Sequence, residues 1–389
     1  MKENDKLINY ILASFLFLAF NIPSLKIVFI NHELVNVIII IGFLAVGIVK
    51  VISDKEIPLL EQKGRGYYWL LLMFLWIVLI VSGLVSNYAE LAMVDLAKYL
   101  SVCLAFSTAF LALERKEIKL FLFFHLAWSI LVSTLRLMGF VNLNPSLGEN
   151  YLVMGFPLSI GLLVAVALFF TKNEWGWKAL ALLGVILNTG ALSQLSGRAS
   201  ILFPTILIIV YIIYYNWKNQ KFLWLYSTLG GFIVIAVAGW FLSPALRRTE
   251  RMMDLFTSIE DEPRVDVYQY YIDRSLDNLL GYGLNAWAAD ENYGYPHNFF
   301  LEIFYSTGLF GLVISIIIIF LLLKYMLSLI KNWEIDFIVV GSIFVALHSF
   351  LTWNVSFDLS SSYLLFLAMA LVVINYFELN YKKLNNRNL

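Results

Sequence analysis

The stretch YYWLLLMFLWIVLIVSGLVS, residues 67–86, contains no charged side chain. A helix needs about 20 mostly apolar residues to cross the hydrocarbon core of a bilayer. The rest of the chain has the same character, because 61% of its 389 residues are apolar and only 14% are charged. An average soluble domain is about 25% charged. This composition excludes a disordered chain, a coiled coil and an ordinary water-soluble enzyme. It predicts an all-α polytopic membrane protein.

Stretches of this kind recur along the chain, and together they predict about twelve transmembrane helices. The predicted spans are 8–30, 34–52, 67–86, 91–113, 118–141, 152–171, 179–195, 199–217, 222–243, 299–323, 337–357 and 359–379. The seventh and eighth are separated only by Ser196-Gly197-Arg198, and the last two meet near Asp358. Eleven spans, or one re-entrant segment, therefore stay open as alternatives.

The lysines and arginines are distributed as the positive-inside rule requires for a cytoplasmic N-terminus. In that orientation 18 of the 27 lie in cytoplasmic segments or at the cytoplasmic ends of spans, and one, Arg198, lies in a short external loop. Three lie deeper within spans, and five lie in the long external loop 244–298. We expect both termini in the cytoplasm, and a first span that is retained because no small-residue cleavage site follows it. The expected organisation is helices 1–9 in 1–243, an external loop subdomain in 244–298, and helices 10–12 with a cytoplasmic tail in 299–389.

The long loop is predicted to contain short helices. Residues 245–259 form one amphipathic pattern, and a second helix begins with Asp261 as N-cap and Pro263 as first helical residue. Arg264, Tyr268 and Tyr271 share one face of that second helix. Gly281 and Gly283 then allow a tight turn.

The charges of this loop leave two interpretations open. Its five basic residues are all arginine, which binds phosphate in a bidentate fork. It also contains ten acidic residues, so the net charge of the loop is −5. Anion binding is one hypothesis, and a pair of interfacial helices with ordinary surface ion pairs is the simpler alternative.

Ionisable side chains at membrane depth are functional candidates, because burying a charge in lipid is costly. Arg198 lies at an external turn, Arg136 in the outer half of a span, and Glu302 one turn into the tenth span. Asp95 and Lys98 have the spacing of an ordinary helical ion pair. His297 lies at the junction of the external helices and a span, where it would face both water and a membrane-borne substrate.

The sequence gives little support for a metal site, a disulfide-rich fold or a nucleic-acid-binding surface. No histidine pair has zinc-ligand spacing, and the single cysteine, Cys103, excludes a disulfide framework. A net charge of zero offers no basic surface for nucleic acid. We therefore expect no metal, no cofactor and no nucleic-acid partner.

Three motifs together resemble the O-antigen ligase and polysaccharide polymerase superfamily. They are LSGRAS at 195–200, EPRVDVYQYYIDRSLDNLLGYGLNAW at 262–287 and PHNFFLEIFYSTGLFG at 296–311. The resemblance implies a metal-independent glycosyltransferase with a GT-C-like fold at the outer face of the bacterial plasma membrane. Its donor would be a glycan on undecaprenyl diphosphate, and its acceptor another glycan. Arg198 and Arg264 match the family's arginines and His297 its histidine, which implies diphosphate binding and catalysis respectively.

Further residues are supporting candidates only. They are Arg136, Tyr268, Tyr271, Asn298 and Glu302. The leading functional hypothesis is a polymerase that joins lipid-linked repeat units into O-antigen, capsule or exopolysaccharide, in contact with a chain-length regulator. A ligase that moves finished glycan to another acceptor is the first alternative. A flippase of lipid-linked sugars is disfavoured by the long loop and the lack of an internal repeat. An enzyme using His32-Glu33 and a metal ion ranks lower because that loop is short.

Overall fold

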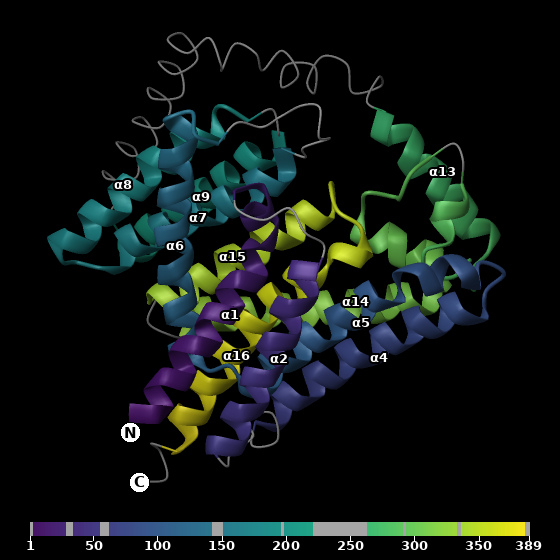
Figure 1. Cartoon of the computed structure of the whole chain (residues 1–389), viewed down its shortest axis with the longest axis horizontal. Helices are drawn as coiled ribbons and strands as arrows, with labels where there is room; N and C mark the ends of the chain where they lie inside the picture. The colour runs from purple at the N-terminus through teal and green to yellow at the C-terminus, as the bar shows by residue number, and fades with distance from the viewer. Residues whose placement is uncertain are drawn as a thin grey trace. The chain divides into compact units, whose positions relative to one another are not determined.

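The fold is all-helical, as the composition predicts. The computed structural model describes residues 3–28, 34–54, 62–141, 151–195, 198–220, 263–290, 293–332 and 336–385 (Figure 1). Over these residues it contains α-helices and two short 3₁₀ helices and no strand. The α-helices are α1 (Glu3–Val28), α2 (Leu34–Asp54), α4 (Lys63–Val85), α5 (Ala89–Ala112), α6 (Arg115–Leu137), α7 (Tyr151–Thr171), α8 (Trp175–Leu192), α9 (Arg198–Lys218), α13 (Pro263–Asp277), α14 (Phe299–Asn332), α15 (Phe337–Trp353) and α16 (Tyr363–Asn385). The 3₁₀ helices are η3 (Ala286–Ala289) and η4 (Leu359–Ser361).

Eight of these helices are long and apolar enough to cross a membrane, and α1, α2 and α15 contain shorter apolar segments. Each predicted span that falls on described residues therefore coincides with a helix, which confirms a polytopic membrane protein. The predicted span 222–243, the predicted helix 245–259, Asp261 and the His32-Glu33 pair lie outside the described residues.

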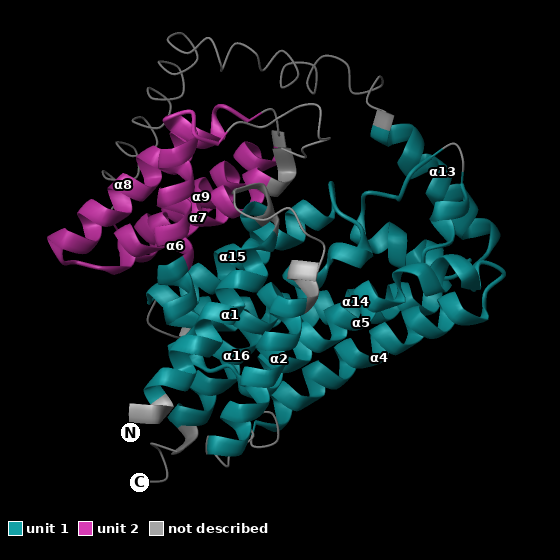
Figure 2. Ribbon diagram, viewed as in Figure 1, with its two compact units in different colours: residues 1–124, 263–389 teal, residues 125–262 magenta. Residues whose placement is uncertain are grey.

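The chain forms two compact units (Figure 2). The first comprises residues 1–124 and 263–389, and the second comprises 125–262, so the boundary falls within α6. The division at 243 and 298, expected from the length of the loop, stays a prediction.

The first unit is built around α16. Every residue from Ser362 to Asn375 is buried, and α16 contacts α4, α5, α14 and α15. A helix that is apolar on all sides is stable only inside a bundle. The few polar groups on this stretch are paired, as where the Asn375 amide donates to Ser342 Oγ of α15 at 2.9 Å.

Two buried cationic side chains donate hydrogen bonds to the last backbone carbonyls of α5. Lys50 of α2, 2% exposed, donates to the Ala112 carbonyl at 2.7 Å and to Glu117 at 3.0 Å. Arg65 of α4 donates to the carbonyls of Ala109 and Leu113 at 3.2 and 2.8 Å. The end of a helix leaves its final carbonyls without intrahelical partners, so these two cations hold α2 and α4 against α5.

The helix α14 contains a break that the sequence does not reveal. Gly308 has φ 65° and ψ −158°, a combination essentially restricted to glycine. The turn after α13 bridges this break, because Tyr282 N and Gly283 N donate to the carbonyls of Tyr305 and Ser306 at 2.8 and 2.9 Å. Leu309 N in turn donates to Leu279 O at 2.9 Å. The single continuous span expected from 299 is therefore a broken helix with a loop docked on it.

We expect Gly308→Ala to destabilise the protein strongly. A Cβ at this position would lie 1.9 Å from Leu279 O, a backbone atom that has no freedom to move away. The substitution should cost about 3 kcal/mol or more, measured as thermal unfolding in detergent.

Gly294→Ala is the matched control for this substitution. Among the described residues, no atom lies within 4 Å of a Cβ built on Gly294, and its φ is not positive. Wild-type stability of Gly308→Ala would contradict the role given to the break.

In the second unit, α7 is the central helix and packs on α8 and α9. The carbonyl oxygen of Pro157, within α7, is hydrogen-bonded to His125 Nε2 of α6 at a distance of 2.9 Å. Asn188 of α8 bonds Ser133 and Ser129 of α6 at 2.9 and 3.2 Å. Such interhelical polar bonds are typical of membrane bundles, and they make His125 a structural residue.

Candidate functional site

The site is built on α13, which packs against α14 through its tyrosine face. Tyr271 and Ser275 are fully buried, and Tyr271 forms an apolar cluster with Ala286, Leu301 and Tyr305. Four aliphatic residues recur at helical spacing along 265–279, and their side chains are exposed instead: Val265, Ile272, Leu276 and Leu279. Aromatic packing on α14, rather than the aliphatic stripe, therefore positions this helix.

The first turns of α13 hold the segment that leads into α14. The Tyr271 hydroxyl donates to Gly294 O at 2.8 Å, and the Tyr268 hydroxyl lies 3.4 Å from His297 O. His297 has φ 53°, a left-handed conformation rare for a residue with a Cβ. Asn298 follows and caps α14, since its Oδ1 accepts from Leu301 N at 3.0 Å. The chain thus turns sharply at His297 before the helix begins.

The connection between α15 and α16 closes the site from the other side. Its backbone carbonyls accept hydrogen bonds from the His297 segment. Asn354 O accepts from Asn298 Nδ2 at 3.3 Å, and Ser356 O accepts from the Tyr295 hydroxyl at 2.7 Å. Glu302, 1% exposed, accepts from Leu359 N at 3.0 Å and anchors η4. We name residues 354–358 the site turn.

His297 lies between these elements. Its ring centroid is 3.9 Å from that of Tyr295, and its Nδ1 is buried with no hydrogen-bond partner among the described residues. Burial and the positive charge of Arg264 lower the pKa of His297 below its usual 6.5. The backbone of Ser356 and the negative charge of Asp358 oppose that shift without cancelling it. The imidazole is therefore neutral at neutral pH and able to accept a proton.

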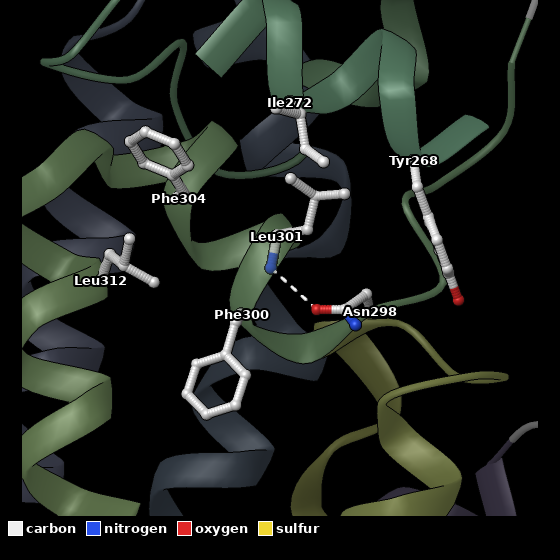
Figure 3. A pocket seen from close by; sticks show the side chains of 7 residues that line it. All are labelled: Tyr268, Ile272, Asn298, Phe300, Leu301, Phe304 and Leu312. Atoms are coloured by element: carbon white, nitrogen blue, oxygen red, sulfur yellow. Dashed lines mark hydrogen bonds between the residues drawn. The ribbon is translucent and has the colours of Figure 1, made fainter. Parts of the chain in front are cut away.

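An apolar cavity of about 250 Å³ opens beside these polar groups (Figure 3). Its lining residues are Tyr268, Ile272, Asn298, Phe300, Leu301, Phe304 and Leu312. Tyr268 and Asn298 lie together at one end of the cavity in Figure 3, and aliphatic and phenyl side chains line the rest of it. The cavity therefore suits an amphipathic ligand with one polar end.

The remaining predicted residues belong to the second unit. Arg198 is the first residue of α9, and its side chain is not among those the structure describes. Arg136 lies at the end of α6 and donates to Val141 O at 2.9 Å. A backbone carbonyl therefore accepts a hydrogen bond from the guanidinium that the sequence places in the outer half of a span. The structure thus brings together Arg264, Tyr268, Tyr271, His297, Asn298 and Glu302, and it does not place Arg198 or Arg136 relative to them.

Within the described residues, no three His, Cys, Asp or Glu side chains gather as a metal site would require. The Asp95–Lys98 pair forms as predicted, with a distance of 2.6 Å between Asp95 Oδ1 and Lys98 Nζ.

In a comparison with known protein families, residues 180–316 match the family model described as O-antigen ligase. The match supports the O-antigen ligase and polymerase superfamily. It indicates a ligase- or polymerase-type function, in a membrane setting and with lipid-linked glycan substrates. No curated protein matches the chain at a significant level.

The O-antigen ligase match contains most of the predicted site. Arg198, Arg264 and His297 fall inside 180–316, as do Tyr268, Tyr271, Asn298 and Glu302, whereas Arg136 falls outside. The site turn also falls outside, and the sequence shows it only as a weak separation of the last two spans. Tyr295 precedes the histidine by two residues, but nothing in its spacing indicates the bond to Ser356.

Proposed function

We propose that this protein is a glycosyltransferase that polymerises undecaprenyl-diphosphate-linked repeat units at the outer face of the bacterial plasma membrane. The observation that carries the proposal is His297. It is a neutral, half-buried imidazole in the family-matched region, beside an arginine and an apolar cavity. A base, a cation and a space for lipid are the three elements that transfer from a lipid diphosphate requires.

The reaction follows from these groups. The acceptor hydroxyl oxygen attacks the anomeric carbon of the donor sugar and forms the new glycosidic bond. The bond between that carbon and the diphosphate oxygen breaks, and undecaprenyl diphosphate leaves with the electron pair. His297 takes the proton of the hydroxyl, a role worth about 10²–10⁴-fold in rate. Attack from the face opposite the diphosphate inverts the anomeric centre.

The arginines supply electrostatic stabilisation in this proposal. Arg264 is half-buried at the start of α13, close enough to His297 to affect its pKa. A guanidinium in a site of low dielectric stabilises the negative charge that develops on a departing diphosphate. Arg198 shares this role. The N-terminal turn of α13 favours anionic groups as well, because the first backbone N–H groups of a helix have no intrahelical partners.

The cavity beside Tyr268 supports a lipid-linked donor. Its polar end lies at Asn298, next to His297 in the chain, and its apolar part extends along α14. Tyr268 and Tyr271 hold the segment that contains the base, and Glu302 and Asn298 hold the site turn and the start of α14. These supporting residues act through the position of His297. No metal and no cofactor enters the reaction.

A ligase is the second candidate, since the matching family model is described as an O-antigen ligase. It would use the same donor and base and transfer finished glycan to another acceptor. A reconstitution with lipid-linked repeat units distinguishes the two. A polymerase lengthens the glycan on the lipid, whereas a ligase moves it from the lipid to an added acceptor. Movement of intact lipid-linked glycan across the bilayer with no new glycosidic bond would indicate a flippase and contradict the proposal.

The pH dependence of transfer should report His297. Asp358 raises the pKa of His297, so Asp358→Asn should lower that pKa further. Because the base acts only when unprotonated, the acidic limb of kcat/KM should move to lower pH. Asparagine still caps η4, where Asp358 accepts from Ser361 N at 3.2 Å.

Ser360→Ala is the control for this substitution. It removes the 2.6 Å bond from Ser360 Oγ to Asp358 without changing any charge, so the limb should stay in place. A limb that moves to higher pH in Asp358→Asn would assign the titration to another group.

A further inference from the structure

The exposed surface of α13 consists of two stripes of opposite character. Helical spacing places Val265, Ile272 and Leu276 on one stripe, where they are 41% to 59% exposed. The turn that follows continues this stripe with Leu279 and Leu280, which are 51% and 88% exposed. We name these five side chains the apolar strip. The second stripe, about 110° farther round the helix, contains the exposed residues Asp266, Asp273 and Asp277.

A cavity of about 450 Å³ joins the apolar strip to the spans α4 and α14. Its walls include Ile77, Val81 and Ser82 of α4, Leu279 and Leu280 of the strip, and Phe310 of α14. Ile77, Val81 and Phe310 are themselves 49% to 59% exposed. An exposed apolar side chain on a membrane-spanning helix faces lipid hydrocarbon. The strip therefore continues a surface that already faces lipid.

The two spans agree on the depth at which the strip ends. In α4 the uncharged stretch 66–85 is 20 residues long, about the length of one span, and Val81 and Ser82 lie in its last turn. In α14 the uncharged stretch is 303–323, and Leu309 is its seventh residue. Leu309 N donates to Leu279 O at 2.9 Å. Both helices thus place the turn after α13 just inside one edge of the hydrocarbon core.

The charges of α13 agree with this depth. A helix that lies in a membrane interface keeps its charged stripe in water and buries its apolar stripe among the acyl chains. The three aspartates lie on the far side of the apolar strip from the buried face with Tyr271 and Ser275. With two arginines against three aspartates, the net charge of α13 is −1. Apolar burial, rather than attraction to anionic lipid, is the force available to hold the helix at the bilayer.

We propose that α13 is an interfacial helix whose apolar strip inserts among the acyl chains of the outer leaflet. Tyr271 and Tyr268 tie this helix to the segment of His297, through contacts of 2.8 Å to Gly294 O and 3.4 Å to His297 O. Insertion therefore holds Arg264 and His297 at the level of the lipid headgroups. There they meet the diphosphate of a membrane-borne donor without its leaving the bilayer. This consequence rests on the proposed function, whereas the insertion does not.

The insertion can be measured without any activity. The chain has one cysteine, Cys103, which is buried, so Cys103→Ala provides a background for single nitroxide labels. The full-length protein, labelled at Ile272→Cys or Leu276→Cys, is reconstituted into phosphatidylcholine vesicles. Collisions of the label with oxygen, which concentrates in hydrocarbon, are compared with collisions with a water-soluble nickel chelate.

Asp273→Cys is the matched control, because Asp273 is exposed on the same helix but belongs to the acidic stripe. We expect the ratio of oxygen to nickel collisions to be about tenfold higher at positions 272 and 276 than at 273. Equal ratios would place the strip in water. Shielding of the strip from both reagents would show that protein covers it, either a second copy or another part of the chain. Either result overturns the proposal.

Paired asparagine substitutions give a second test. Leu276→Asn with Leu279→Asn weakens insertion, and we expect transfer from a lipid-linked donor in vesicles to fall about tenfold. Asp273→Asn with Asp277→Asn places the same residue type on the acidic stripe and should leave the rate unchanged. Equal rates in both double variants would contradict insertion. If the wild-type protein shows no transfer but its labels show the expected pattern, the proposed function fails and the interfacial helix stands.

Discussion

Replacing His297 with alanine is expected to abolish glycan transfer, with a loss of at least about 10²-fold. The reason is that the nearest carboxylates already accept hydrogen bonds from backbone N–H groups, Asp358 from Ser361 and Glu302 from Leu359. Glu302 is the nearest acidic candidate on α14, but it is buried, and its Oε2 accepts a hydrogen bond from Leu359 N. The measurement is product formation from lipid-linked repeat units in proteoliposomes, with membrane insertion and thermal stability checked in parallel.

His125→Gln is the matched control for this histidine. A glutamine amide can keep the bond to Pro157 O, which His125 Nε2 contacts at 2.9 Å. We expect full activity, because His125 holds two helices of the second unit together and contacts no substrate. Normal chain length in His297→Ala would remove His297 from catalysis and leave it as a residue that shapes the start of α14.

The second large effect is expected for Arg264→Lys. Lysine keeps the charge but loses the planar fork that binds two phosphate oxygens at once. We expect kcat to fall about tenfold to a hundredfold, because the contact strengthens as charge develops on the leaving diphosphate. Arg198→Lys should behave in the same way. The rates are to be measured at saturating donor, so that weakened donor binding is separated from slower chemistry.

Arg274→Lys is the control on the same helix. Arg274 is exposed and lies over the rings of Tyr270 and Tyr282, with its Cζ 5.8 and 5.6 Å from their centroids. Lysine can keep a cation over an aromatic ring, so activity should stay near that of the wild type. Full activity in both Arg264→Lys and Arg198→Lys would reduce these arginines to surface charges.

Part of the site could be predicted from local sequence alone. Pro263 begins α13 as its ring geometry favours, and Phe299 begins α14 directly after His297-Asn298. The shared face of Arg264, Tyr268 and Tyr271 follows from helical spacing. These predictions succeed because each depends on residues within a few turns of one another.

Other features escaped prediction because they depend on partners distant in the chain. A glycine in an apolar run looks the same whether its helix continues or breaks, so the unusual φ and ψ of Gly308 were not foreseeable. The break is stable because Leu279, Tyr282 and Gly283 supply its hydrogen bonds. Likewise, the periodicity of Val265, Ile272 and Leu276 indicates a helix, but periodicity does not say which face meets a neighbour. That face proved to be the one with Tyr271 and Ser275.

The sequence by itself determined that this is a helical membrane protein, where its spans lie, and which residues match the O-antigen ligase and polymerase superfamily. The lengths of the apolar stretches, the positions of the charged residues and the order of the motifs are properties of the linear sequence. They therefore do not depend on how the chain folds. Only the tertiary structure decided that the carbonyl of Ser356 accepts a hydrogen bond from Tyr295, beside His297, because that contact joins a turn after α15 to a residue before α14. Hydrogen bonds between such distant segments arise from the packing of whole helices, which no local pattern encodes.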